Sequence, residues 1–130
     1  MANRIWNRAA LGNDPGEGVD LPDGDRALRA LLLAYGLIMN SGVFQCVHES
    51  LSESELEASI KGYAYFGFDD AVAILRDATV VEDPWVESNE VVSINLDARF
   101  AAAIPTDAVV ADRFETRLAT HPEDFAPVDP

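Results

Sequence analysis

Apolar residues are densest in one stretch of this chain, residues 25–39, where they recur at helical spacing. Leu28, Leu31 and Tyr35 mark one face, and further leucines and alanines fill most of the others. A helix that is apolar on every side belongs in the interior of a domain. The pattern therefore predicts a central helix around which the other elements pack.

A second helix is predicted by the residues at its start. Ser52 with Glu55 three residues later is typical of a capping box, in which each side chain closes a backbone N–H of the other residue. Leu51 and Leu56 stand at the two positions of a hydrophobic staple. The helix that begins here should end at Gly67.

Shorter helices are expected on either side of these two. Apolar spacing and breaking residues place them at 3–11, 43–49, 71–80, 96–103 and 108–119. We expect Asp23 or Asp25 to cap the central helix, because a short carboxylate accepts the unpaired N–H groups of a first turn. Asp69 or Asp70 should likewise cap the helix at 71–80.

Residues 91–96 fit two structures. Val92, Ile94 and Leu96 alternate as in a strand. A lone strand would leave its backbone groups unpaired. We therefore expect an extended segment that leads into a helix capped by Asn95.

These elements predict an all-α fold, a compact single-domain orthogonal bundle of about six to seven short helices around the central apolar helix. A length of 130 residues suits one domain over 1–130. Within it we expect a short helix and an acidic loop over 1–24 and the core over 25–125. Residues 12–24 are rich in glycine, proline and aspartate, which is typical of a loop.

Charge narrows the class of partner. Acidic residues number 23 and basic residues 9, for a net charge of −14. Such an imbalance weakens binding to nucleic acid and to anionic membranes and favours basic partners. We therefore expect a basic protein partner, no direct nucleic-acid binding and no membrane association. The apolar run at 25–39 is also too short to span a bilayer.

Cysteine usage and the first residues indicate the compartment. Cys46 is the single cysteine, so the chain forms no internal disulfide, which fits a reducing environment. Residues 1–8 lack the apolar core of a signal peptide. We expect a cytoplasmic protein.

A polar segment follows the central helix: Asn40-Ser41-Gly42-Val43-Phe44-Gln45, which we call the corner. Gly42 suits the left-handed backbone of a helix end. Buried amides must be hydrogen-bonded, so we expect Asn40 and Gln45 to fasten the corner through a polar network. The alternative is a small-molecule or catalytic pocket formed by Asn40, Gln45, Cys46 and His48.

Enzyme motifs are not found in the sequence. It contains no phosphate-binding glycine loop, no nucleophile elbow and no His-Glu-x-x-His. Cys46 and His48 are two residues apart, so on a helix they point in different directions and cannot share a metal. We expect no metal, no cofactor and no catalytic activity.

Several short motifs occur in order across about residues 26–125. They are Asn-x-Gly-x-x-Gln at the corner, Phe66-Gly67, Ala71 to Leu75, Leu96-Asp97-Ala98-Arg99-Phe100 and His121-Pro122-Glu123-Asp124-Phe125. In this succession the chain resembles a bacterial family of unknown function whose namesake is a DNA-mimic protein. Asn40, Gly42, Phe44 and Gln45 carry the structural signature of the resemblance. Ser41 stands where the family usually has a glycine, and Cys46-Val47 where it usually has an aromatic pair.

The resemblance implies an all-helical domain without known catalytic activity, often a homodimer. For the namesake it also implies an acidic surface that occupies the DNA-binding face of a transcription factor. Carboxylates in this chain could form such a surface: Glu53 and Glu57 lie one helical turn apart, about 6 Å. The full candidate set is Glu49, Glu53, Glu57, Asp69, Asp70, Asp77, Glu82 and Asp83.

We therefore predict a non-enzymatic acidic binding protein, a DNA mimic directed at the basic surface of a transcription factor or another nucleic-acid-binding protein. Two alternatives stay open. One is an immunity or inhibitor protein that blocks a basic nuclease toxin. The other is a small-molecule-binding protein or enzyme with its pocket near the corner.

Overall fold

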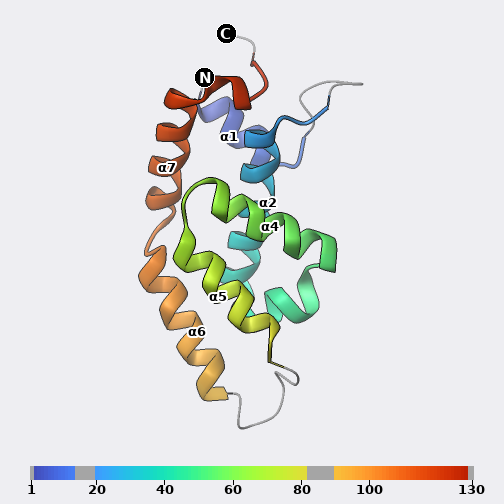
Figure 1. The fold of residues 1–130 in the computed structure, drawn as a ribbon, viewed down its shortest axis with the longest axis vertical. Helices are drawn as coiled ribbons and strands as arrows, with labels where there is room; N and C mark the ends of the chain where they lie inside the picture. The colour runs from blue at the N-terminus through green and yellow to red at the C-terminus, as the bar shows by residue number, and fades with distance from the viewer. Residues whose placement is uncertain (1, 14–19, 82–89, 129–130) are drawn as a thin grey trace.

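The computed structural model describes residues 2–13, 20–81 and 90–128. The all-α prediction is confirmed, since these residues contain helices and no strand. In chain order the elements are α1 (Ala2–Ala10), α2 (Asp23–Ser41), α3 (Val43–Gln45), the π-helical turn η1 (Cys46–Ser50), α4 (Glu53–Tyr65), α5 (Asp69–Thr79), α6 (Glu90–Ala103), α7 (Asp107–Thr120) and the 3₁₀ turn η3 (Pro122–Asp124) (Figure 1). Among the described helices, none is long and apolar enough to cross a membrane.

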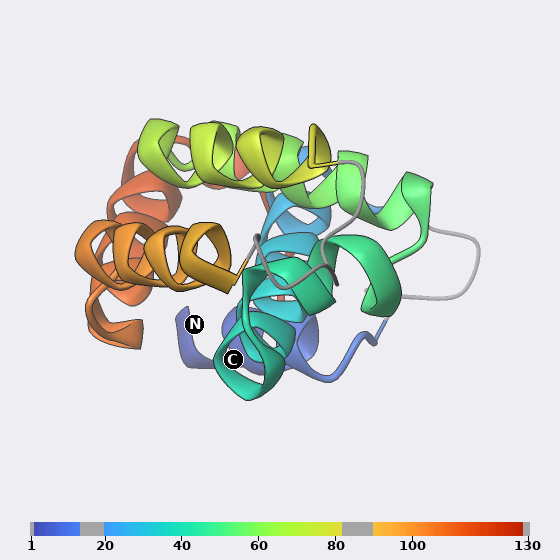
Figure 2. The same cartoon turned by 90° about the horizontal axis from the view of Figure 1, so that it is seen from below.

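Helix α2 lies at the centre of the bundle, as predicted. Helices α6 and α7 follow one another along one edge of the molecule, and α4 crosses in front of α2 (Figure 1). Seen from below, α4 and α5 lie above α2 and α1 lies beneath it (Figure 2). Leu28 and Leu31 of α2 are fully buried and belong to the same apolar cluster as Tyr63, Phe100 and Phe114 from three other helices.

Helix α4 approaches the backbone of α2 more closely than ordinary side chains would allow. A Cβ atom on Gly62 would lie 2.5 Å from the carbonyl oxygen of Ala27. On the same side of α4, the Ser59 hydroxyl donates to Ala30 O at 3.3 Å and the Tyr63 hydroxyl donates to Leu31 O at 3.4 Å. Small and hydroxyl-bearing residues therefore make this crossing close.

Parts of α2 are not covered by other helices. Leu33 is 44% exposed and Met39 63% exposed, although the sequence predicts apolar residues buried on every side. Leu33 lines a groove of about 600 Å³, which is formed mainly by apolar residues of α1 and α2 and by Leu11. Helix α2 is thus central but not fully enclosed.

The capping prediction is confirmed for α4 and wrong for α2 and α5. The Ser52 hydroxyl accepts from Glu55 N at 3.2 Å, and the Glu55 carboxylate accepts from Ser52 N at 2.9 Å. Hydrogen bonds from Ser52 to the Glu55 carboxylate, the one from its backbone N–H first, lower the pKa of this carboxyl because they favour its charged form. Helix α2 instead begins after Pro22, and no side chain caps it.

Helix α5 also begins without a side-chain cap, after Phe68. Asp69 and Asp70 lie in its first turn, where a negative charge interacts favourably with the helix dipole without closing a backbone donor.

The prediction for 91–96 is wrong, because α6 is already helical from Glu90 and Asn95 lies inside it. The apolar alternation does not correspond to a buried face: Val92 is 40% and Ile94 63% exposed, while Leu96 is buried. Leu96 and Phe100, four residues apart, are the buried positions of α6, which is helical spacing. The expected members Glu82 and Asp83 of the acidic surface lie outside the described residues.

Candidate functional site

The corner turns at Gly42, as the sequence predicts. Gly42 has φ 89° and ψ 168°, a conformation open essentially to glycine alone, and its N–H donates to Ile38 O at 2.8 Å to close α2. Directly after it, Val43 N donates to Asp97 Oδ1 of α6 at 2.9 Å. The Asp97 carboxylate thereby satisfies an unpaired donor at the start of α3, as a helix-capping side chain does.

The two amides of the corner do not form the expected polar network. Asn40 and Gln45 are both exposed. The Asn40 side chain donates to its neighbour Ser41 Oγ at 3.1 Å, and no bond joins it to Gln45. The two remaining signature positions agree with the prediction, since Gly42 makes the turn and Phe44 is buried. The corner is therefore held by Asp97 from a distant helix and not by its own amides.

Replacing Asp97 by alanine should lower the free energy of unfolding by about 1–2 kcal/mol, because Val43 N loses its acceptor and the start of α3 its cap. The matched control is the double change Asn40→Ala and Gln45→Ala. Both side chains are exposed, so its effect should stay within about 0.5 kcal/mol. Urea denaturation of the unchanged protein and of the two variants measures both changes in the free energy of unfolding. A larger loss of stability in the double variant than in Asp97→Ala would show that the two amides fasten the corner, as the sequence predicts.

Cys46 and His48 follow the corner in the π-helical turn, but they do not share a site. The Cys46 thiol is buried against Ala34 O at 3.9 Å, and burial raises its pKa to about 11. A reactive thiol needs the opposite shift. His48 Nε2 lies 2.9 Å from Ala78 O, near the end of α5. Because a carbonyl only accepts, Nε2 carries the hydrogen, and the imidazole bonds one of the last carbonyls of α5.

The pocket alternative therefore lacks geometric support. Asn40 and Gln45 face solvent, Cys46 faces α2 and His48 faces α5. None of the four lines a described cavity. The described part of the chain also holds no group of three or more histidine, cysteine, aspartate or glutamate residues placed to bind a metal ion.

The predicted acidic residues face solvent but do not form one contiguous cluster. Glu49, Glu53, Glu57, Asp69, Asp70 and Asp77 are all exposed. Glu53 and Glu57 lie near the start of α4, whereas Asp69 and Asp70 follow its end, and a 13-residue helix is about 20 Å long. Asp77 is paired with Arg99 at 2.9 Å, so its charge is partly compensated.

Most of the described basic residues are exposed as well, but three arginines make contacts that hold the fold together. Arg8 pairs with the buried Asp25 at 2.6 Å, which places this carboxylate in the core and not at a helix cap. Arg113 donates to the carbonyls of Phe66 and Gly67 and lies over the Phe68 ring. Arg117 lies over the ring of Tyr65.

The consequence for the surface is a large excess of carboxylates. Every described acidic residue except Asp25 and Asp124 is exposed. Among the described residues, arginine pairs involve Asp23, Asp25 and Asp77, the first of these at 3.8 Å.

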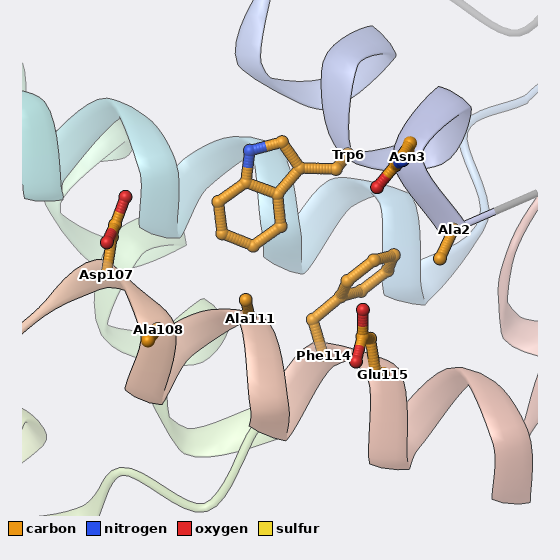
Figure 3. A pocket seen from close by; sticks show the side chains of 8 residues that line it. All are labelled: Ala2, Asn3, Trp6, Asp107, Ala108, Ala111, Phe114 and Glu115. Carbon is orange, nitrogen blue, oxygen red and sulfur yellow. The ribbon is translucent and has the colours of Figure 1, made fainter.

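A pocket that the sequence did not predict lies between α1 and α7. It has a volume of about 250 Å³ and is lined by Ala2, Asn3, Trp6, Asp107, Ala108, Ala111, Phe114 and Glu115. Figure 3 shows the Trp6 indole reaching from α1 toward α7, with the Asp107 and Glu115 carboxylates on either side of it. We call it the Trp6 pocket. No local pattern could have indicated it, because its two helices lie at opposite ends of the chain.

Comparisons with protein-family models, with curated proteins and with solved structures return no match to this chain. The resemblance to the DNA-mimic family rests on its motifs alone and stays a prediction.

Proposed function

We propose that this protein is a non-enzymatic acidic binding protein that acts as a DNA mimic. Its partner in this proposal is the basic DNA-binding surface of a transcription factor or of another nucleic-acid-binding protein. The observation that carries the proposal is the large excess of carboxylates on the described surface. Nearly all described carboxylates face solvent and outnumber the exposed basic residues, while Arg8 compensates the one buried carboxylate, Asp25.

Electrostatics explains how such a surface would work. Duplex DNA presents a dense array of negative charges, and a basic groove binds it largely through them. Carboxylates fixed on helices offer the same groove an alternative without base recognition. Glu53 and Glu57, one turn apart on α4, are a unit of such an array. The same field repels nucleic acid itself, so the proposal includes no direct binding to DNA or RNA.

The proposed compartment is the cytoplasm. Cys46 is a buried free thiol, which is compatible with a reducing environment. Basic nucleic-acid-binding proteins are available there as partners.

The test is capture of the partner followed by competition with DNA. The immobilised protein is exposed to native lysate at about 50 mM salt, and bound proteins are eluted with duplex DNA. We expect a DNA-binding protein in the eluate, with its affinity for the captor falling roughly tenfold or more between about 50 and 200 mM salt. In a gel-shift assay the same partner should lose its DNA as the acidic protein is added.

A charge variant provides the control. Glu53→Gln, Glu57→Gln, Asp69→Asn and Asp70→Asn together remove four exposed negative charges and should weaken capture without changing the helical circular-dichroism spectrum. Recovery of a nuclease whose cleavage is blocked would favour the inhibitor alternative. If the eluate contains no basic protein at low salt, the proposal is wrong.

A further inference from the structure

The Trp6 pocket combines an aromatic wall with two carboxylates. Trp6 is half-buried, and its ring packs against Phe114 with centroids 5.7 Å apart and planes tilted by 56°. Its neighbour Ile5 is buried in the core, which fixes α1 and so directs the indole toward α7. Part of a large apolar ring is therefore left open beside polar groups, an arrangement typical of binding surfaces.

The carboxylates follow a ridge of α7. Asp107, Ala111 and Glu115 are spaced four residues apart, so they lie on one side of the helix over about 12 Å. The small side chain of Ala111 between them keeps the hollow open beneath the indole, as Figure 3 shows. Within residues 2–13, 20–81 and 90–128, neither Asp107 nor Glu115 forms an ion pair.

The chemistry of this lining selects a cation. Tryptophan is the aromatic ring that holds a cation best, and a guanidinium group stacks on its face while it donates to carboxylates. An apolar ligand would gain from the rings but would leave both carboxylates desolvated without a partner. A volume of about 250 Å³ is below the usual range of small-molecule sites, about 300–1,000 Å³, and suits one long side chain.

We propose that the Trp6 pocket binds an arginine side chain of the basic partner. This inference rests on the proposed function and adds a specific anchor to it. The anchor lies between α1 and α7, apart from the carboxylates of α4 and α5 that the sequence singled out. It supplies a fixed contact on a surface that otherwise attracts its partner by charge.

The experiment titrates the purified protein with an octa-arginine peptide and follows Trp6 fluorescence. The chain has two tryptophans, so the reference protein carries Trp85→Phe, which leaves Trp6 as the only reporter. We expect saturable binding with a change in the Trp6 emission. Asp107→Asn with Glu115→Gln should weaken binding about tenfold more than Glu53→Gln with Glu57→Gln, which removes the same charge elsewhere.

A second variant tests the ring. Trp6→Leu, with binding followed by calorimetry, should lose about 3- to 30-fold in affinity for the peptide. If Trp6→Leu does not fold, the double variant Asp107→Asn with Glu115→Gln tests the anchor by itself. Both residues are exposed, so their replacement leaves the packing intact. Equal losses of affinity in the double variant of the pocket and in the double variant of Glu53 and Glu57 would show that charge alone binds the peptide. That result would overturn the anchor.

Failure of the anchor is distinguishable from failure of the proposed function. The peptide titration uses only the purified protein, whereas the proposed function is tested by capture from lysate and competition with DNA. Equal losses of peptide affinity in the two double variants, together with a captured DNA-binding protein, would reject the anchor and support the proposed DNA mimicry. Binding of the peptide in the pocket without any captured DNA-binding protein would reject the mimic and keep a cation site.

Discussion

Replacing Asp25 by alanine should lower the free energy of unfolding by about 3–5 kcal/mol, the usual cost of leaving one member of a buried ion pair alone. Arg8 Nη2 donates to Asp25 Oδ1 at 2.6 Å and to Ala126 O at 2.9 Å. Ala126 N donates to the other oxygen, Asp25 Oδ2, at 2.7 Å. The substitution therefore strands a guanidinium and a buried N–H together, and it detaches α1 and the C-terminal segment from α2.

The matched control is Asp77→Ala, which breaks an ion pair of similar length on the surface. Asp77 and Arg99 lie 2.9 Å apart, but their side chains are 56% and 41% exposed, against 3% for Asp25 and 12% for Arg8. Its cost should be about 0–1 kcal/mol. Urea denaturation measures both variants, and a double-mutant cycle with Arg8→Ala isolates the pair. Equal small losses in the two variants would show that burial does not strengthen the Asp25 contact.

Replacing Gly62 by alanine should cost about 3 kcal/mol or more, at the upper end of what overpacking a core usually costs. The added Cβ would lie 2.5 Å from Ala27 O, and a second backbone atom, Leu31 N, is 3.4 Å away. A helix backbone cannot swing aside as a flexible side chain can. Relief requires that α4 and α2 move apart, which also lengthens the bonds from Ser59 and Tyr63.

The same substitution at Gly36 is the control, and the opposite sign is expected. Gly36 lies in the middle of α2, and a Cβ there meets no atom within 4 Å. Alanine reduces the conformational freedom of the unfolded chain, so Gly36→Ala should raise stability by roughly 0.5–1 kcal/mol. Denaturation midpoints of the two variants on either side of the parent would confirm the close crossing. Stabilisation by Gly62→Ala would contradict it.

Much of the local structure of this protein could be predicted from short stretches of sequence. The capping box of Ser52 and Glu55 closes within four residues, and Gly42 turns the chain by its own conformational freedom. Each of these features depends on neighbours along the chain, so a single sequence contains enough information to predict it.

The fate of the polar residues could not be predicted in the same way. A short carboxylate before a helix has the same local pattern whether it caps that helix or turns inward, and only the approach of Arg8 and Ala126 places Asp25 in the core. Val43 N finds its acceptor in Asp97, 54 residues further along the chain. The alternating apolar residues at 91–96 resemble a strand in the sequence. In the structure this segment is helical, because Leu96 and Phe100 pack into the core from one face of α6.

The sequence by itself determined the all-helical class, the helix starts and stops that close over a few residues, and a net charge of −14. The tertiary structure decided where that charge is compensated and where it is left open. It buried Asp25 against Arg8, left Asn40 and Gln45 in solvent and brought Trp6 to Asp107 and Glu115. The physical reason is range: capping and backbone preference act between neighbours, whereas burial and charge pairing depend on which distant segments the core brings into contact.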